Sequence, residues 1–530
     1  MKKNSLGTLL QLHYHHRPCG VSTVIDRYAK TFADINKAAR CGNVVLCGEK
    51  GAAFPISKVK VIVCKEMGYA QFTSKKGFEQ TRDCIEKRLK RILRDPAFPR
   101  PIFVVAHNTT LGKNCALSSA LSRLARDFDA MGDDSRFFLV VHDFAEEGRI
   151  EQLCHIQKLQ SMGIHIWEDL YPACSNVTFV TINNRNKTLL QKAGCKTVLL
   201  RNPVWQATAP LKMSKQKMRF RLRQKAEADD VALQANRPFL LYPTRIMVRK
   251  NPLEAILIAT VYAKANLLLG TVWGKAGNDF ALLDQCKKIC KTYSLPVLFD
   301  TYGLLGKNEA PQAMYSLADA VVSTSIAEGF GYLFAESSQF NKPVIGRMPQ
   351  GLSANELGDT QYLYRQLMVP CSWVDVEKVA RLYFKRLASL TQWNSATKSW
   401  DGFFTSFQKA HVSKGGIDFG CLDMASQVAV LHKCLRSQTG MDELRKAFPR
   451  QTEKLASFFA ATTAGKQSNT PLMLSGDFPM DFEACFLSKS KHRANCPIQA
   501  KLIGKYFADL SRFKIGMSGK KNVSVISPSP

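Results

Sequence analysis

The sequence predicts an α/β protein with two doubly wound halves, each built on a parallel sheet, followed by a mainly helical C-terminal extension. Short apolar runs alternate with amphipathic stretches from the start, the alternation stops and then resumes, and it weakens after about residue 400. Strand–helix alternation of this kind is typical of parallel sheets buried on both faces. The chain has 530 residues, of which 45% are hydrophobic and 22% charged, and this composition excludes a disordered or fibrous protein.

The first half, predicted over 1–205, holds seven apolar runs that we interpret as buried parallel strands. They are 9–15, 43–48, 59–64, 101–107, 136–142, 176–181 and 196–200. Amphipathic stretches between them, such as 21–40 and 115–131, predict the covering helices. The sequence therefore predicts a first Rossmann-like domain that ends near residue 205.

A basic segment, 206–236, separates the two halves. Between residues 212 and 225 it has seven basic residues and no acidic one, which is typical of a solvated helical linker. The second half, predicted over 237–400, resumes the alternation with strands at 237–245, 265–274, 295–300, 318–325 and 342–346. The extension 401–530 predicts helices at 421–436 and 441–462 and a disordered tail. In such two-domain proteins the ligand is expected in the cleft between the halves, at the carboxyl ends of the strands.

The formal net charge is +31, and +17 of it falls in residues 1–236. A basic surface favours polyanions such as nucleic acid, an anionic membrane or a phosphorylated substrate. No apolar run is long enough to cross a bilayer, and the first residues turn polar too early for a secretory signal. The 16 cysteines form no Cys-x-x-Cys pair, which favours free thiols in a reducing compartment. We therefore expect a cytoplasmic protein, with peripheral docking on the inner face of the membrane as an open alternative.

The sharpest motif lies in 318–346, where a strand is followed by Glu328, two glycines and a helix that carries Glu336. The glycines let the backbone turn tightly close to a ligand, and the helix start offers free amides to phosphate. Glu336 lies eight residues after Glu328, about 12 Å further along at helical rise. Two carboxylates so placed are suited to gripping two polyol parts of one long ligand.

This segment resembles the Glu-x7-Glu motif of family-4-type retaining glycosyltransferases, which have the two-domain GT-B fold, and the resemblance extends over about 1–390. It implies that Glu328 binds hydroxyls of a donor sugar and that Glu336 binds the ribose of its nucleotide. It also implies that the turn between the two acids holds sugar and diphosphate. The donor-binding residues of that turn are Gly329, Phe330, Gly331, Tyr332 and Leu333.

A second motif, 242–252, places cations at the end of the second half's first strand. Arg245 and Lys250 are similar to the family's pair that stabilises the leaving diphosphate, and Arg249 competes for the same role. A departing diphosphate needs cations for its developing charge, and Arg and Lys supply it in different geometries.

The exit of the first strand carries histidines and a single glycine. Members of the family have Gly-Gly-Val near the donor phosphates, whereas this chain has Cys19, Gly20 and Val21, so only Gly20 remains as a donor-binding residue. His13, His15 and His16 have the composition of a metal cluster. Their place at a strand end favours an active-site wall or a buried interior instead, and we expect no metal site.

Further polar residues follow two other strands of the first half. The resemblance implies that His142 lies beside the reacting sugar as a catalytic residue. For acceptor recognition, the candidates are His107, Asn108, Asp143, Glu146 and Arg149. For His107 a purely structural role is equally well supported.

Together these motifs predict a retaining, metal-independent glycosyltransferase that needs no cofactor and takes a nucleotide diphosphate sugar as its donor. The acceptor is expected to be a hydroxyl of a glycan, glycolipid or other polar molecule, and the positive charge hints at an anionic acceptor or a membrane surface. The alternative is a nucleic-acid or anionic-membrane binding protein on an inactive glycosyltransferase scaffold, although no specific nucleic acid is expected. A sugar phosphorylase or synthase of the same fold is a third possibility.

Overall fold

The computed structural model describes residues 7–17, 19–35, 42–51, 59–147, 149–204, 214–271, 278–304, 310–357, 362–388, 399–463, 478–486, 502–503 and 506. The chain divides into two compact units. The first comprises Met1–Pro203 with Ser475–Ala508, and the second comprises Val204–Leu474 with Asp509–Pro530.

The first unit is built on a seven-stranded parallel sheet in the order β3-β2-β1-β4-β5-β6-β7. The strands are β1 (Thr8–His13), β2 (Gly42–Cys47), β3 (Lys60–Val63), β4 (Ile102–His107), β5 (Arg136–Val141), β6 (Val177–Thr181) and β7 (Thr197–Leu199). Each of the seven predicted apolar runs overlaps one of them, and β1 and β2 begin one residue earlier than predicted. The two-domain parallel fold predicted from the sequence is thus confirmed for this half.

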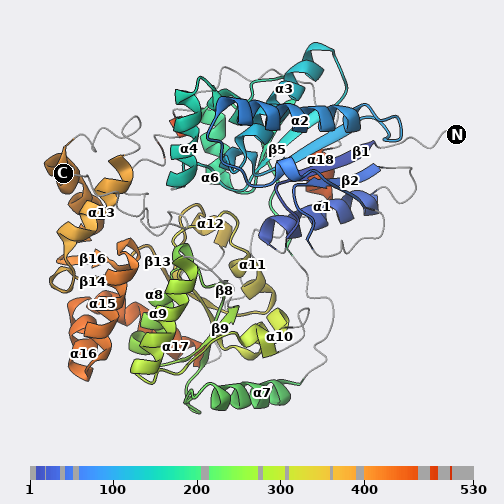
Figure 1. Ribbon diagram of the computed structural model, residues 1–530. Helices are drawn as coiled ribbons and strands as arrows, with labels where there is room; N and C mark the ends of the chain where they lie inside the picture. Colours follow the sequence, from blue (N-terminus) through green and yellow to red (C-terminus); the bar gives the residue numbers. More distant parts are fainter. Residues whose placement is uncertain are drawn as a thin grey trace. The chain divides into compact units, whose positions relative to one another are not determined.

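Helices cover both faces of this sheet. They are α1 (Gly20–Ile35), α2 (Lys75–Leu93), α3 (Cys115–Ala130), α4 (Ile150–Ser161), α5 (Ile166–Leu170), α6 (Asn184–Lys192) and α18 (Phe478–Phe486). Figure 1 shows α1 with α18 on one side of the sheet and α2 with α3 on the other. Helix α18, which lies within the predicted extension 401–530, therefore belongs to the first unit.

Aromatic packing fixes α18 on α1. The ring of Tyr28 lies with its centroid 5.5, 5.3 and 5.6 Å from the rings of Phe478, Phe482 and Phe486. Phe486 also contacts Phe138 of β5 at 4.7 Å in an edge-on arrangement. Such pairs add to the burial of large apolar surfaces, so the helix is held by its phenylalanines.

The second unit has a six-stranded parallel sheet in the order β10-β9-β8-β11-β12-β13. Its strands are β8 (Phe239–Arg245), β9 (Asn266–Thr271), β10 (Val297–Leu298), β11 (Ala320–Ser323), β12 (Val344–Arg347) and β13 (Leu363–Tyr364). A small antiparallel sheet joins β14 (Met368–Pro370), β16 (Gly416–Asp418) and β15 (Val412–Ser413). The five predicted strands are present, whereas β13 and the small sheet are too short to leave a period in the sequence.

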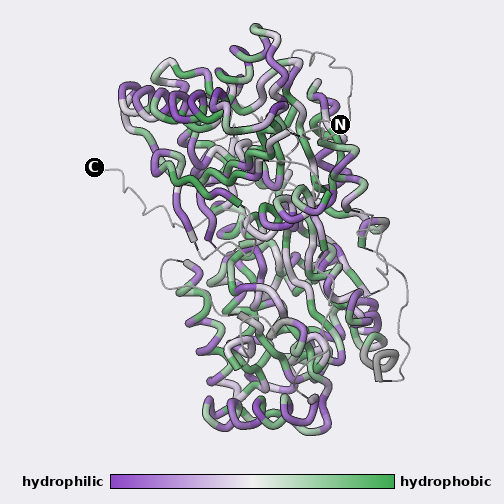
Figure 2. Tube along the Cα trace, turned by 90° about the vertical axis from the view of Figure 1, so that its right-hand side faces the viewer, coloured by the Kyte–Doolittle hydropathy of each residue, from purple (hydrophilic) through white to green (hydrophobic). Residues whose placement is uncertain are grey.

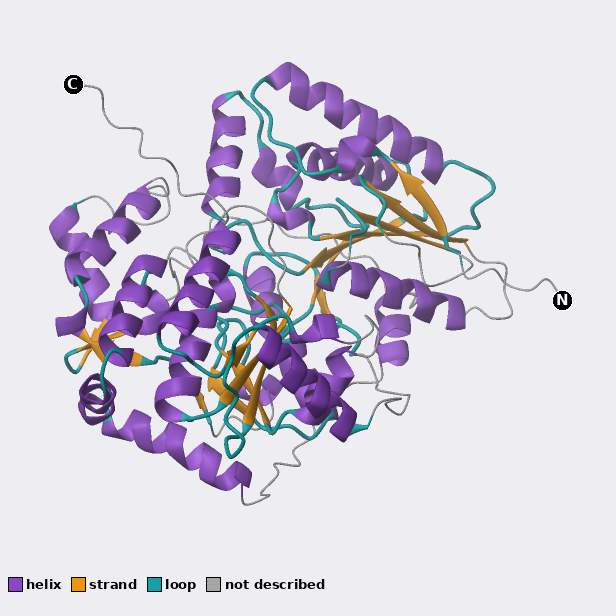
Figure 3. Cartoon of the chain, turned by 60° about the horizontal axis from the view of Figure 1, so that its bottom comes forward, coloured by secondary structure: helices purple, strands orange, loops and turns teal. Residues whose placement is uncertain are grey.

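Helices surround these strands and continue to residue 463 (Figure 3). They are α7 (Lys215–Ala228), α8 (Pro252–Leu257), α9 (Asn278–Thr292), α10 (Ala310–Leu317), α11 (Tyr332–Gln339), α12 (Ala354–Leu357), α13 (Val376–Ala388), α14 (Trp400–His411), α15 (Met424–Leu435), α16 (Gln438–Ala447) and α17 (Pro449–Thr463). The helix expected at 441–462 is two helices, because Pro449 cannot continue a preceding helix and holds Phe448 outside the helical region (φ −132°, ψ 69°). The predicted disordered tail lies outside the described residues.

Residues 215–228 of the basic stretch predicted as a linker form helix α7 of the second unit. The Ser214 hydroxyl accepts a hydrogen bond from the Lys217 amide at the helix start, which is a favourable N-cap. Met218, Leu222 and Ala226 recur at helical spacing and are buried. The cations therefore flank a packed face, while Phe220 is 59% exposed on the outside.

A buried ionic cluster joins the small sheet to the main sheet of the second unit. The Arg347 guanidinium donates to Glu254 (2.6 and 3.0 Å) and to Asp418 (2.8 and 3.0 Å). The Tyr364 hydroxyl donates to Glu254 at 2.7 Å. Arg347 is 2% exposed, so the cluster is stable only because its donors and acceptors satisfy one another.

Figure 2 shows hydrophobic and hydrophilic residues alternating along the helical turns of the chain. Within the described part of the chain, none of the helices combines the length and hydrophobicity that a membrane crossing requires. The cysteines that the structure describes are free thiols.

Candidate functional site

The second unit's candidate site begins at the carboxyl end of β8. Arg245 ends this strand and is exposed, and a short turn over Val248–Lys250 follows. Asn251 then adopts the left-handed region at φ 54°, which asparagine tolerates better than most residues, before Pro252 opens α8. Its side-chain amide donates to Glu254 at 2.6 Å and its oxygen accepts from Gln427 at 3.0 Å.

The backbone of Lys250 is held by two neighbouring strands. Its carbonyl accepts hydrogen bonds from the hydroxyl of Tyr242 at 2.9 Å and from the hydroxyl of Thr324 at 3.0 Å. Tyr242 lies on β8, and Thr324 directly follows β11. The position of this lysine is therefore set by the sheet.

The loop that carries Glu328 is fastened to the loop that carries Lys250. The Ile326 amide donates to the Arg249 carbonyl at 3.0 Å. The backbone of Gln350 holds the same loop through two hydrogen bonds. Its carbonyl accepts from the Glu328 amide at 3.2 Å, and its amide donates to the Ile326 carbonyl at 2.9 Å. Two segments more than seventy residues apart in sequence thus present their charged side chains together.

The charged centre of this site is the ion pair between Lys250 and Glu328. The lysine Nζ donates to Glu328 Oε1, and their side chains are 12% and 13% exposed. Arg249 lies with its Nη1 3.8 Å from Glu328 Oε2 and donates to the Ala327 carbonyl at 3.1 Å. The structure therefore brings the predicted catalytic Lys250 and Glu328 into contact and adds Arg249 to them.

Burial and neighbouring charges shift both members of the pair. Burial lowers the pKa of Lys250 to about 8, because the attraction of Glu328, which raises this pKa, is smaller than the effect of burial, and Arg249 and Arg245 lower it further. Burial alone would raise the pKa of Glu328, but Lys250 and Arg249 outweigh it and the pKa is lowered. Both groups are consequently charged at neutral pH, and a net positive charge surrounds the carboxylate.

The turn into α11 contains the residues predicted to hold a donor sugar. Gly331 has φ +80°, and a Cβ there would approach Leu352 Cδ1 to 2.6 Å, so the position requires glycine. The rings of Phe330 and Tyr332 meet edge-on at 4.8 Å. Gly329 and Leu333 belong to the same turn. That these residues bind a donor stays a prediction.

Glu336 lies on α11 and is half-buried. The Tyr315 hydroxyl donates to its Oε2 at 2.9 Å. Burial raises the pKa of Glu336, and the tyrosine hydrogen bond opposes this shift. Its predicted contact with a ribose stays a prediction, for which Tyr315 would orient the carboxylate.

In the first unit, a pair of histidines lies at the carboxyl ends of β4 and β5. His107 Nδ1 is 3.3 Å from His142 Nε2, and the two rings stack at 5.6 Å with an interplanar angle of 20°. Burial lowers the pKa of His142 to about 4, and burial together with His142 and His13 lowers the pKa of His107 well below its usual value. Both rings are therefore neutral at physiological pH.

The other predicted acceptor-side residues have partners inside the unit. Asn108 adopts φ 65°, and its Oδ1 accepts from the Asp143 amide at 2.9 Å. An Asp143 carboxylate oxygen lies 3.6 Å from Arg149. Glu146 is 3% exposed and accepts from the Tyr171 hydroxyl at 3.0 Å, while burial raises its pKa to about 7. The contact of these residues with an acceptor stays a prediction. The hydrogen bonds of Asn108 and Glu146 hold the loop that follows β5.

The exit of β1 is where the structure comes nearest to a metal cluster among the described residues. One ligand atom each of His13, His15 and Cys19 lie within 4.8 Å of one another. His15 is already engaged by the Tyr69 hydroxyl at 3.1 Å and the Arg17 amide at 3.3 Å. Gly20 opens α1, and a Cβ there would meet open space, so the backbone is accessible to a ligand.

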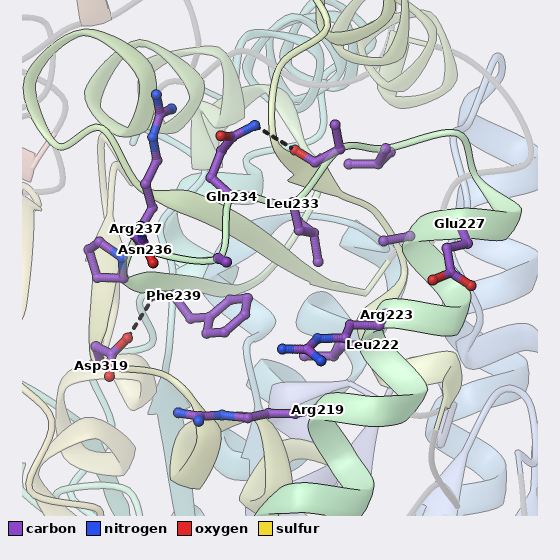
Figure 4. A pocket seen from close by; sticks show the side chains of 15 residues that line it. Arg219, Leu222, Arg223, Glu227, Leu233, Gln234, Asn236, Arg237, Phe239 and Asp319 are labelled. Atoms are coloured by element: carbon purple, nitrogen blue, oxygen red, sulfur yellow. Dashed lines mark hydrogen bonds between the residues drawn. The ribbon is translucent and has the colours of Figure 1, made fainter.

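A pocket of about 740 Å³ in the second unit lies elsewhere (Figure 4). It is lined by α7, by residues 231–239 and by Asp319, which precede or begin β8 and β11. Arg219 and Arg223 extend from α7 across it. This pocket is therefore at the amino ends of the strands, opposite to the edge that carries Lys250 and Glu328.

Sequence reasoning missed three residues that organise these sites. Tyr242 and Thr324 hold the Lys250 carbonyl, and Gln11 of β1 contacts His107 at 3.1 Å. Gln11 is a polar residue within the apolar run LLQLH, a signal that could have revealed it. Hydroxyls that bind backbone leave no comparable signal.

Comparison with known proteins yields one curated relative and a set of solved structures, while no protein-family model matches the chain. The relative is a mannosylglucosyl-3-phosphoglycerate synthase of Petrotoga mobilis, 26% identical over 398 residues, which are 72% of this chain and 73% of that protein. A sucrose-phosphate synthase from Thermosynechococcus elongatus is 12% identical, with a TM-score of 0.47, and covers 86% of this chain and 99% of its own.

A trehalose-6-phosphate structure from E. coli, described as bound with UDP-2-fluoro glucose, is also 12% identical, with a TM-score of 0.46 and coverage of 92% and 100%. The TM-scores are below 0.5, so the fold assignment depends on the strand order observed in the chain itself. The resemblance to glycosyltransferases predicted from the sequence is confirmed. The function of the Glu-x7-Glu motif stays a prediction.

Proposed function

We propose that the chain is a glycosyltransferase that moves a sugar from a nucleoside diphosphate sugar to a hydroxyl of an acceptor. The observation that carries this proposal is the buried Lys250–Glu328 pair, with Arg249 beside it and Arg245 exposed nearby. Such a site offers cations for a diphosphate and a carboxylate for sugar hydroxyls. The name of the curated relative, a synthase of a glycosylated phosphoglycerate, supports the same reaction class.

In the proposed reaction, the acceptor oxygen forms a bond to the anomeric carbon while the bond from that carbon to the diphosphate oxygen breaks. The departing diphosphate takes the electron pair of the broken bond and accepts the acceptor's proton. Lys250 and Arg245 would stabilise the negative charge that develops on it, and the first amides of α11 would contribute. Glu328 would hold sugar hydroxyls and keep Lys250 in place.

We further propose that attack and departure occur on the same face of the sugar, so that the anomeric configuration is retained, as the sequence resemblance implies. No cofactor is proposed, and the charge on the leaving group would be met by side chains of this chain without a metal ion. Turnover should then be insensitive to a chelator. Loss of turnover with chelator and its recovery with added metal would contradict this part.

The acceptor is proposed to be a polar, anionic molecule with a free hydroxyl. Two facts support this proposal: the net charge of +31 and the phosphoglycerate group in the relative's name. A neutral acceptor turned over without dependence on salt concentration would contradict it, because screening weakens long-range attraction.

The test is a donor screen with the full chain. Each nucleotide sugar is incubated with and without a phosphoglycerate-type or glycan acceptor, and released nucleoside diphosphate and product are measured. We expect one donor to be consumed in an acceptor-dependent manner, and the product's anomeric configuration follows from NMR. If every donor stays intact with every acceptor while the chain is folded, the proposal fails.

A binding role on an anionic surface is the second candidate, and α7 is the observation that favours it. This helix carries exposed cations beside the exposed ring of Phe220. Co-sedimentation with anionic vesicles, and binding of DNA at increasing salt, would measure it. Vesicle binding without any sugar transfer would favour this candidate over the first.

A further inference from the structure

Gln11 is a buried polar side chain whose two ends have different partners. It lies in the middle of β1 and is 0% exposed. Its Nε2 donates to the Ile25 carbonyl of α1 at 3.0 Å, and its Oε1 lies 3.1 Å from His107 Nε2. A carbonyl only accepts hydrogen bonds, so the amide nitrogen must face Ile25 and the amide oxygen must face His107.

This orientation determines which nitrogen of each histidine carries a proton. The Gln11 oxygen can only accept, so His107 Nε2 is protonated, and in a neutral ring His107 Nδ1 then has a lone pair. That lone pair is 3.3 Å from His142 Nε2, which must therefore donate. The remaining nitrogen of His142, Nδ1, is left unprotonated.

The strand register explains why these three side chains meet. β1 pairs Gln11 with Val105, two residues before His107, and β4 pairs His107 with Val140, two residues before His142. Side chains two residues apart lie on the same face of a strand. The hydrogen bonds from Gln11 through His107 to His142 form a relay. Each step of this relay moves to the next strand and two residues toward its carboxyl end.

Neighbouring groups close the relay on its other sides. His13 Nδ1 lies 3.2 Å from the His107 carbonyl, and the ring of Tyr28 packs against the ring of His107 at 5.5 Å. Among the described residues, no hydrogen-bond partner is found for His142 Nδ1. The relay thus ends in an acceptor atom at the carboxyl edge of the sheet.

We propose that Gln11, acting through His107, is a positioning residue that fixes His142 with Nδ1 unprotonated, so that His142 accepts a hydrogen bond from a substrate hydroxyl. This inference rests on the proposed function, which supplies a hydroxyl-bearing substrate. An unprotonated imidazole nitrogen attracts a hydroxyl and repels a phosphate oxygen. His142 would therefore select a hydroxyl of the substrate and reject an anionic group at this position.

The first test needs no variant for its main result. Nitrogen NMR of the full chain with labelled histidine should show His107 and His142 protonated at Nε2 and unprotonated at Nδ1 at neutral pH. Their signals are assigned from His107→Gln and His142→Gln. A His142 ring protonated at Nδ1 would overturn the inference.

The second test changes Gln11. In Gln11→Met, which has a similar volume and no hydrogen bonds, His142 should show a mixture of tautomers. In Gln11→Glu the side chain, protonated because burial disfavours its charge, keeps an oxygen acceptor and should keep the wild-type tautomer. Unchanged tautomers in Gln11→Met would overturn the role of Gln11. Thermal unfolding of each variant verifies that it is folded.

Kinetics distinguish this inference from the proposed function. Gln11→Met should lower kcat for sugar transfer about tenfold, the size expected for one lost hydrogen bond, with KM for the donor unchanged and with recovery in Gln11→Glu. Full kcat in Gln11→Met overturns the inference and leaves the proposed function intact. Predicted tautomers in a wild-type chain that transfers no sugar confirm the positioning of His142 and overturn the proposed function.

Discussion

The two units carry the same kind of parallel sheet and opposite chemistry at its carboxyl edge. In the first unit the buried histidines at this edge are neutral, because burial lowers the pKa of His142 to about 4 and that of His13 to about 3, and the charged Asp143 and Arg149 lie beside each other in the loop after β5. In the second unit the edge presents charged groups, with Lys250 and Arg249 around Glu328. One kind of sheet thus presents different side chains at its strand ends, and function has to be argued from these side chains and not from the fold.

The difference follows from the partners that the buried polar side chains have at each edge. The imidazoles lack a nearby carboxylate strong enough to offset burial, so neutral rings linked by hydrogen bonds are the stable form. Lys250 and Glu328 neutralise each other and are anchored through hydroxyls of Tyr242 and Thr324. A neutral edge suits hydroxyl groups, and a charged edge suits a diphosphate.

Removing the lysine from the charged edge should have the largest effect. Lys250→Met removes the cation that we propose to meet the leaving group and leaves Glu328 buried beside one arginine, so we expect sugar transfer to fall about 1,000-fold or more. Steady-state release of nucleoside diphosphate measures it. Lys288→Met, an exposed lysine on α9, is the matched control and should keep wild-type turnover. Turnover within threefold of wild type in Lys250→Met would refute the charged edge as the reaction site.

Neutralising the carboxylate of the same edge should have the next largest effect. Glu328→Gln keeps the shape and removes the charge that holds Lys250, and we expect transfer to fall about 100-fold. The exposed Glu377→Gln on α13 serves as the control. An equal loss in both variants would show that the effect is not specific to the site.

On the neutral edge, Glu146 should make stability depend on pH. Its pKa is about 7 in the folded unit and about 4.5 unfolded, so the folded state binds more protons between these values and stability falls as pH rises through them. Glu146→Gln cannot titrate and can still accept from Tyr171. Relative to this variant, the wild type should lose about 2 kcal/mol between pH 5 and 7. Parallel unfolding curves for the two proteins would contradict the burial of a proton on Glu146.

The smallest predicted effect is a fall of kcat/KM for sugar transfer at alkaline pH. In the proposed reaction Lys250 acts in its charged form, and its pKa of about 8 means that kcat/KM should fall about tenfold by pH 9. Lys250→Arg remains charged at that pH and should not show this fall even if its maximum rate is lower. A wild-type profile that stays flat to pH 10, or a fall that persists in Lys250→Arg, would assign the dependence to another group.

Much of the fold could be predicted from the sequence, because long apolar runs such as 101–107 and 136–142 have no stable alternative to a buried strand. The glycines around Phe330 and the acids Glu328 and Glu336 likewise marked the second unit's turn. What sequence could not predict depends on long-range pairing: the Arg347 cluster, the docking of α18 on Tyr28, and the relay from Gln11. Glu146 and Asn108 were predicted to contact an acceptor because they are polar residues that follow a strand. The structure shows both of them buried, with hydrogen-bond partners inside the unit.

The central claim is that the charged edge of the second unit binds a nucleoside diphosphate. Calorimetric titration of UDP, GDP and ADP into the full chain, and into Lys250→Met and Lys288→Met, tests it most directly. We predict that the wild type and Lys288→Met bind one of the three with the same affinity, while Lys250→Met binds it at least tenfold more weakly. No binding by the folded wild type, or equal binding by Lys250→Met, would contradict the claim.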